Sequence, residues 1–175
     1  MSETQEQIVW QGKFVTAKVK GKWEYVSRSR GIKAAVILAI DDADHVLLVE
    51  QFRVPLGKPC IELPAGLIGD DDSTPDEDAA TAANRELEEE TGYSAARMEA
   101  VGEFYSSPGM VTESFTLFKA HGLTQIGPGG GVAGENITVH RVPLADIGEF
   151  IESARTRGLG IDVRLLMLLA PGILT

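Results

Sequence analysis

Four glutamates crowd the end of the clearest helix signature in this chain, in the stretch "NRELEEETGY" (residues 84–93). At 100° per residue, Glu86, Glu89 and Glu90 share one face of such a helix. Glu88 points away from that face. No lysine or arginine follows these glutamates at a spacing of three or four, and the helix dipole disfavours negative charge at this end. The isolated helix would be destabilised, so a cation is expected to neutralise the face.

The three glutamates on the shared face, Glu86, Glu89 and Glu90, offer oxygen ligands only, and this chemistry suits Mg²⁺, with Mn²⁺ as a substitute. Magnesium keeps several waters and shares its shell with substrate phosphates, so a phosphoryl compound is the expected substrate. The alternative, a solvated glutamate-rich face, predicts interspersed lysines and charge nearer the N-terminus, and the stretch has neither. The pattern therefore predicts a metal site.

The charge of the whole chain limits the partners that are expected. A formal net charge of −10 and a pI near 4.7 argue against nucleic acid and against an anionic membrane surface. A bound divalent metal would reverse the field locally, so a small phosphate ligand stays compatible. Cys60 has no second cysteine to pair with, which favours a reducing compartment. With neither a signal peptide nor a long apolar run, a soluble cytoplasmic protein is expected.

The order of predicted elements is mixed and strand-rich with interposed helices, which indicates one α+β domain. Thr74 as N-cap, Pro75 in the first turn and Glu77 in a capping box predict where the glutamate helix begins, and Gly92 predicts its end. The expected strands cover residues 12–31 (a hairpin turning at 20–21), 32–40, 45–53, 60–66, 97–107, 113–123 and 136–144, and two C-terminal helices are expected at about 144–156 and 161–170.

Residues 77–93 resemble the Nudix box, whose pattern is G, five residues, E, seven residues, R-E-U-x-E-E-x-G-U, with U apolar or bulky. Every fixed position from Glu77 to Tyr93 is met. The resemblance implies an α/β/α sandwich around a mixed sheet and hydrolysis of a nucleoside diphosphate linked to another group by metal-activated water. It also implies that Glu86, Glu89 and Glu90 are metal ligands or base-assisting carboxylates, oriented by Arg85.

One departure from the pattern precedes the helix. The leading glycine of the pattern stands six residues before the first glutamate, whereas Gly66 stands eleven before Glu77, so this loop is five residues longer. The inserted acidic run at residues 70–72 fits either a metal-binding segment or a solvated loop tip. Glu77 fits both the capping box and a salt bridge with Arg85.

The resemblance narrows to the ADP-ribose pyrophosphatases through residues 49–68 and 104–113, and through the spacing of fifteen residues from Tyr93 to Pro108. It implies that the backbone carbonyl of Ala65 completes the metal shell. It also implies a catalytic base on a mobile loop, for which Glu135 is the candidate and Glu113 the competitor. Residues 129–131, all glycine, are expected to give that loop hinge freedom.

By the same resemblance, substrate-binding residues come from the N-terminal part. Trp23 is the candidate for stacking on adenine and Phe14 for a second stacking position, although core packing would equally explain Phe14. Glu24 is a candidate acceptor for the adenine amino group. Arg28 and Arg53 suit a clamp on the diphosphate or terminal ribose.

The subgroup forms homodimers by exchanging N-terminal strands, so residues 1–30 are expected to serve dimerisation and base binding, and residues 31–175 to form the Nudix domain. The expected activity is Mg²⁺-dependent cleavage of ADP-ribose to AMP and ribose 5-phosphate. Two alternatives remain. One is a hydrolase of another nucleoside diphosphate sugar, such as GDP-mannose, or of an oxidised nucleoside diphosphate. The other is a non-catalytic nucleotide sensor.

Overall fold

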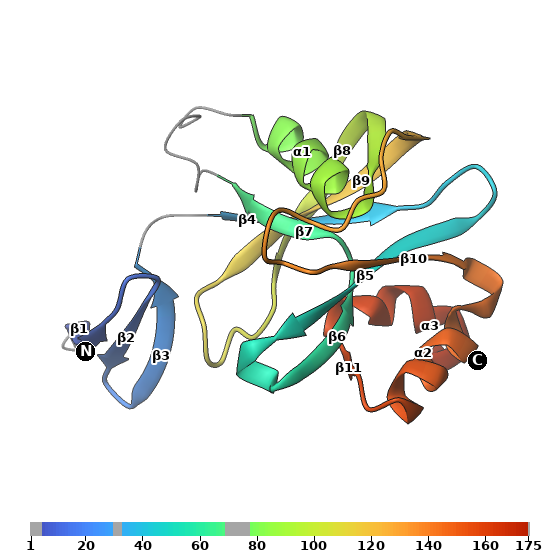
Figure 1. The fold of residues 1–175 in the computed structure, drawn as a ribbon. Helices are drawn as coiled ribbons and strands as arrows, with labels where there is room; N and C mark the ends of the chain where they lie inside the picture. Colours follow the sequence, from blue (N-terminus) through green and yellow to red (C-terminus); the bar gives the residue numbers. More distant parts are fainter. Residues whose placement is uncertain (1–4, 30–32, 69–77, 175) are drawn as a thin grey trace.

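The structure, a computed structural model, describes residues 5–29, 33–68 and 78–174. They form three sheets, with helices on both sides of the two larger ones (Figure 1). The helices are α1 (Ala79–Thr91), α2 (Ile147–Thr156) and α3 (Leu166–Leu174), with short 3-10 turns at Val54–Leu56, Leu144–Asp146 and Val163–Leu165.

The N-terminal strands form a small antiparallel sheet that stands beside the main body (Figure 1). Val26 ties this sheet to the body, because its N–H donates to Met110 O at 2.9 Å and its carbonyl accepts from Thr112 N at 3.0 Å. The predicted hairpin is confirmed, and a further strand that the sequence analysis did not expect pairs with it. The strands are β1 (Gln7–Gln11), β2 (Val15–Lys20) and β3 (Trp23–Arg28).

Two four-stranded sheets make up the body, with the strand orders β10-β5-β6-β11 and β7-β4-β9-β8. Both are mixed, because β11 runs parallel to β6 and β4 runs parallel to β9. Their strands are β4 (Lys33–Ala39), β5 (His45–Arg53), β6 (Lys58–Glu62), β7 (Ala65–Ile68), β8 (Tyr93–Tyr105), β9 (Ser114–Gln125), β10 (Thr138–Pro143) and β11 (Gly160–Ile161).

Strand β4 separates two hydrophobic cores. Alternate side chains point to opposite faces, so Val36 joins the core shared with α2, while Ala35 and Ile37 join the core shared with α1. Both faces are covered, which explains the nearly continuous apolar run of this strand. In Figure 1, α1 lies on one side of these strands and α2 and α3 on the other. This arrangement confirms the expected mixed α+β sandwich.

Three local expectations needed correction. The glutamate helix begins at Ala79 after an N-cap at Asp78, whose carboxylate accepts from two backbone N–H groups of the first turn. Thr74, Pro75, Glu77 and the acidic run at 70–72 lie outside the described residues. The strand expected at 60–66 is two strands, β6 and β7, in different sheets. The last helix begins later than expected, because residues 160–161 form β11. No helix in the described part of the chain is both long and apolar enough to cross a membrane.

Candidate active site

Helix α1 is fixed at both ends and along one face. Asp78 caps its first turn, and Gly92 ends it in the left-handed conformation at φ 74°, which favours glycine. Ala83 and Leu87 are fully buried in the core beneath it. This anchoring determines which side of the helix faces outward.

The outward face of α1 borders a cavity of about 860 Å³. Glu86, Glu89 and Glu90 all line that cavity. Glu88 instead accepts a hydrogen bond from the Asn84 amide at 2.8 Å, on another side of the helix. The structure thus divides the four glutamates as the helical spacing predicts.

Glu90 is the most buried of the three, at 6% exposure. Its Oε2 accepts a hydrogen bond from Ala65 N at 3.0 Å. The pKa of Glu90 is raised to about 8, chiefly by burial; the neighbouring carboxylates of Glu86 and Glu135 contribute to the rise, and the Ala65 N–H and the Arg53 guanidinium oppose it. A cation in the cavity would favour the charged form of Glu90, so these residues fit a divalent metal.

Arg85 lies among the same carboxylates. Its Nη1 is 3.1 Å from Glu86 Oε1 and 3.4 Å from Glu89 Oε2. In this arrangement no three Asp, Glu, His or Cys side chains among the described residues are gathered closely enough to hold a metal ion. Two of the carboxylates that suit Mg²⁺, those of Glu86 and Glu89, are paired with Arg85 here, so a bound cation would compete with the guanidinium for them.

Strand β7 forms another part of the cavity wall through Ala65 and Gly66. A Cβ atom at Gly66 would overlap the Glu86 carboxylate, so a larger residue at this position would displace that side chain. Strand β6 ends at Glu62, and β7 begins at Ala65, whose N–H donates to Glu90.

The glycine-rich loop is docked on the C-terminal end of α1. Gly130 N donates to Glu90 O at 2.8 Å, and Gly131 N donates to Glu89 O at 2.9 Å, which satisfies carbonyls that a helix end leaves open. Gly129 has φ 68°, and a Cβ there would lie 2.4 Å from Thr91 C. The structure shows these glycines docked on the helix end, and the hinge role expected of them stays a prediction.

Glu135 follows in a tight turn of the same loop. Its N–H donates to Val132 O at 3.1 Å, and its Oε2 accepts from Val132 N at 2.9 Å. The exposed side chain lines the cavity, and its charge contributes to the raised pKa of Glu90. The loop thus places the Glu135 carboxylate on the glutamate side of the cavity.

Replacing Gly129 by Ala is expected to destabilise the fold by about 2–4 kcal/mol, because left-handed strain and a backbone clash both apply. Gly127→Ala is the matched control: it lies in the same loop, and its added Cβ meets nothing within 4 Å. Urea unfolding of both variants measures the difference. Equal stabilities would show that the loop is not docked as described.

Arg28 and Glu113 form an ion pair at the cavity rim. Arg28 Nε donates to Glu113 Oε1 at 2.7 Å, and this pair links β3 to the segment before β9. Both side chains line the cavity. The carboxylate of Glu113 is thus engaged with a guanidinium, whereas that of Glu135 accepts only from a backbone N–H of its own loop among the described residues.

A second group of charged residues in the cavity wall was missed by the sequence analysis. Glu62, only 3% exposed, accepts two hydrogen bonds from Arg53 at 2.6 and 3.0 Å and one from Arg164 at 2.9 Å. Arg164 also donates to Asp162 at 2.6 and 2.8 Å. A single glutamate inside the apolar stretch "CIELPAG" was the available signal for Glu62, whereas nothing in the sequence marks Asp162 or Arg164.

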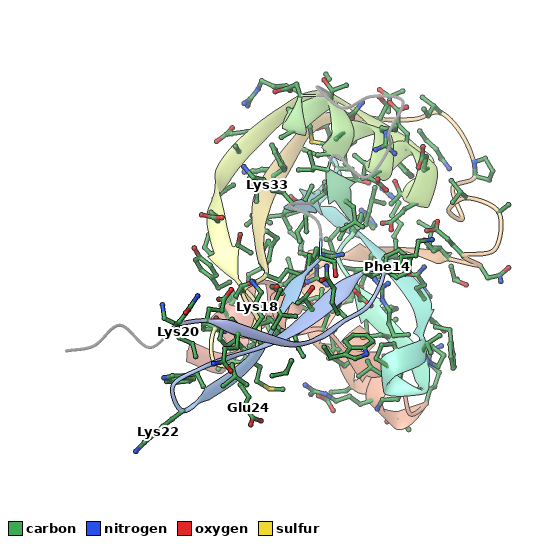
Figure 2. The ribbon with its side chains drawn as sticks, turned by 90° about the vertical axis from the view of Figure 1, so that its left-hand side faces the viewer. Phe14, Lys18, Lys20, Lys22, Glu24 and Lys33 are labelled. Carbon is green, nitrogen blue, oxygen red and sulfur yellow. The ribbon has the colours of Figure 1, made fainter. Side chains whose placement is uncertain are left out.

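Trp23 lies at a different cavity, of about 330 Å³, together with Tyr25 and Pro108. Successive side chains of a strand alternate between its faces, so Trp23 and Arg28 lie on opposite faces of β3. Phe14 is 68% exposed and, like Glu24, lines neither cavity. Figure 2 shows Glu24 near the tip of the hairpin and Phe14 elsewhere on the small sheet.

The large cavity therefore gathers most of the predicted site residues and leaves three outside it. Trp23, Glu24 and Phe14 are the three that lie elsewhere. Those that line the cavity are Arg28, Arg53, Ala65, Arg85, Glu86, Glu89, Glu90, Glu113 and Glu135.

A family model described as the NUDIX domain matches residues 30–155. An uncharacterised Nudix hydrolase of Schizosaccharomyces pombe is 36% identical over 162 residues, covering 83% of this chain and 76% of the relative. The ADP-ribose pyrophosphatase of Bacillus subtilis is 35% identical over 121 residues, covering 69% of this chain and 63% of the relative. The GDP-mannose pyrophosphatase of Cronobacter sakazakii is 37% identical over 159 residues, covering 86% and 77%.

Among solved structures, a crystal structure of an ADP compounds hydrolase superposes with a TM-score of 0.70. It is 23% identical and covers 98% of this chain and 93% of the other, which shows a common fold. The chain belongs to the Nudix hydrolase family. Its relatives in that family include both ADP-ribose pyrophosphatases and GDP-mannose pyrophosphatases.

Proposed function

We propose that this Nudix hydrolase cleaves ADP-ribose to AMP and ribose 5-phosphate in a Mg²⁺-dependent reaction. The observation that carries the proposal is the convergence of Glu86, Glu89 and Glu90 on one cavity, with Glu90 buried there. Such a set of carboxylates is costly without a cation and suits a substrate that arrives with its phosphates. The likeness to the ADP-ribose pyrophosphatase of Bacillus subtilis supports the choice of substrate.

The three glutamates and the Ala65 carbonyl would hold the metal. A bound Mg²⁺ would polarise a phosphoryl oxygen and lower the pKa of water. Glu135 would accept the proton of the attacking water, because its exposed carboxylate lines the cavity and is fixed only by one backbone N–H of its own loop among the described residues. Arg85 would orient Glu86 and Glu89.

Arginine side chains would hold the diphosphate or the terminal ribose. Arg53 lines the cavity with a side chain that is 39% exposed, so it can reach a ligand. Arg28 also lines the cavity, although its pairing with Glu113 leaves it fewer free donors. Guanidinium groups bind phosphate oxygens through paired N–H donors, which fixes the orientation of the substrate.

A homodimer would complete the base-binding part of the site. Apolar side chains of the small sheet are unusually exposed, with Trp10 at 58%, Phe14 at 68% and Trp23 at 65%. Among the described residues that line the large cavity there is no aromatic side chain, whereas a nucleobase favours an aromatic face. We therefore expect the N-terminal sheet of a second copy to bring Trp23 or Phe14, with Glu24, to this cavity, in a cytoplasmic enzyme.

The test is phosphate release, with added phosphatase, from ADP-ribose, GDP-mannose, ADP-glucose and 8-oxo-dGDP, each with Mg²⁺ and with EDTA. Metal-dependent cleavage that favours ADP-ribose is the expected result. Preference for GDP-mannose, which the relative of Cronobacter sakazakii makes the second candidate, would retain the metal site and overturn the base assignment. Binding of nucleotides without any cleavage would point to a sensor.

A further inference from the structure

Four charged side chains in the cavity wall are joined in one chain of hydrogen bonds. Glu62 Oε2 accepts from both Arg53 Nη2, at 3.0 Å, and Arg164 Nη2, at 2.9 Å. The two guanidinium groups are therefore neighbours, held by the same oxygen. Asp162 fixes Arg164 from its other side at 2.6 and 2.8 Å. All four residues line the cavity that the glutamates of α1 line.

The outer half of this network, Asp162 and Arg164, lies beyond residues 30–155, where the NUDIX domain is matched. The C-terminal segment is nevertheless attached firmly to the site. Strand β11 pairs with β6, and Asp162 N donates to Ile61 O at 3.0 Å, directly beside Glu62. This chain therefore adds its own side chains to the cavity of the family domain.

Both guanidinium groups keep free donors. A guanidinium has five N–H groups, and hydrogen bonds within the described part of the chain use two in Arg53 and three in Arg164. Three N–H groups of Arg53 and two of Arg164 thus have no partner among those residues. The Arg164 guanidinium also lies over the Phe115 ring, 5.8 Å from its centroid, which restricts its orientation.

The charge of this wall decides what it can bind. Two guanidinium groups and two carboxylates cancel, and burial raises the pKa of the Cys60 thiol beside them to about 11, so the thiol is neutral. A wall without net charge has little attraction for a phosphate. Free N–H donors beside carboxylate acceptors, with Leu56 adding an apolar surface, suit the hydroxyl groups and the C–H face of a sugar.

We propose that Arg53 and Arg164, held by Glu62 and Asp162, form the subsite for the hydroxylated, non-nucleotide end of a nucleoside diphosphate sugar. The proposal rests on the proposed function for the class of substrate and adds the residues that recognise its sugar. Arg164 and Asp162 are then specificity-determining residues that this chain supplies from outside the matched domain.

Calorimetric titration with two nucleotides, both with Mg²⁺, measures the contribution of the sugar to the binding affinity. The nucleotides are ADP and the non-hydrolysable α,β-methylene analogue of ADP-ribose. Arg164→Met is expected to weaken binding of the analogue about tenfold, the scale of losing a hydrogen bond from a charged donor, and to leave ADP binding within about twofold. Arg164→Lys keeps the charge but lacks the planar set of N–H donors of a guanidinium, and it is expected to behave similarly. Equal weakening of both ligands, or of neither, would overturn the subsite.

Arg155→Met is the matched control, because Arg155 lies in the same C-terminal region in an exposed pair with Glu152 and does not line the cavity. It is expected to change neither affinity. If the wild-type protein bound neither nucleotide, the proposed function would fail, and NMR titration with free sugar would decide the subsite alone. Ribose is expected to shift the Arg164 Nε–H resonance and inorganic phosphate is not. A shift with phosphate only, or with neither, contradicts the proposal.

Discussion

Glu90→Gln is expected to reduce metal-dependent turnover by about 10²–10³-fold or more, the scale of removing one fixed electrostatic group at a reaction centre. Gln keeps the size of the side chain, and its carbonyl still accepts the hydrogen bond from Ala65 N. The variant therefore loses charge at the cavity and little else. Initial rates on the best substrate, across a range of Mg²⁺ concentrations, measure the loss and separate weaker metal binding from slower chemistry.

The same variant is expected to be more stable than the wild-type protein when no metal is present. The pKa of Glu90 is raised from 4.5 to about 8 by burial, so the folded state binds its proton more tightly than the unfolded state does. This contribution to stability is full below pH 4.5 and is lost as pH rises towards 8. At pH 7.5 in EDTA, Glu90→Gln should gain about 4 kcal/mol.

Thermal melts from pH 5 to pH 8 test the sign as well as the size. The difference in Tm between variant and wild type should grow with pH in EDTA and shrink when Mg²⁺ is added, because the cation favours the charged carboxylate. Glu88→Gln is the matched control on the same helix, where the side chain is bonded to Asn84 and does not line the cavity. Normal turnover in Glu90→Gln, or an equal loss of turnover in Glu88→Gln, would contradict the assignment of Glu90 to the metal site.

The part of the site that lies on α1 could be predicted because its information is local. Glu86, Glu89 and Glu90 come within one and a half turns, so helical geometry alone places them on one face. Gly92 as the helix end and the apolar runs of β4 and β5 are equally local signals. The class of the fold followed from the order of these elements, strands with interposed helices, and the structure confirms it by covering both faces of β4.

What the sequence did not reveal depends on contacts between distant segments. Glu62 and Arg164 are 102 residues apart, and their hydrogen bond exists only because β11 pairs with β6. The glycine-rich loop reads as a flexible linker by composition, yet the end of α1 requires its glycines for close packing at Gly129. The packing of the N-terminal sheet on the body decides which face of β3 meets which cavity. Trp23 therefore lines the second cavity, and the sequence alone could not show this.

Glu62→Gln is expected to lower the free energy of unfolding by about 2–4 kcal/mol, because it leaves two guanidinium groups facing an amide in a buried position. The loss should fall at the lower end of the range for breaking a buried ion pair. Arg53 is 39% exposed and can turn towards water, and Arg164 keeps Asp162 as a partner. Urea unfolding at neutral pH measures the change.

Glu152→Gln gives the matched comparison, since it breaks a pair with Arg155 in which both side chains are more than half exposed. Such surface pairs contribute little, so its stability should stay within about 0.5 kcal/mol of wild type. A buried ion network is by itself weak evidence for stability, because desolvation offsets much of the attraction. If Glu62→Gln were as stable as Glu152→Gln, the network would contribute nothing net to the fold, and its retention in the cavity wall would have to be explained by ligand binding alone.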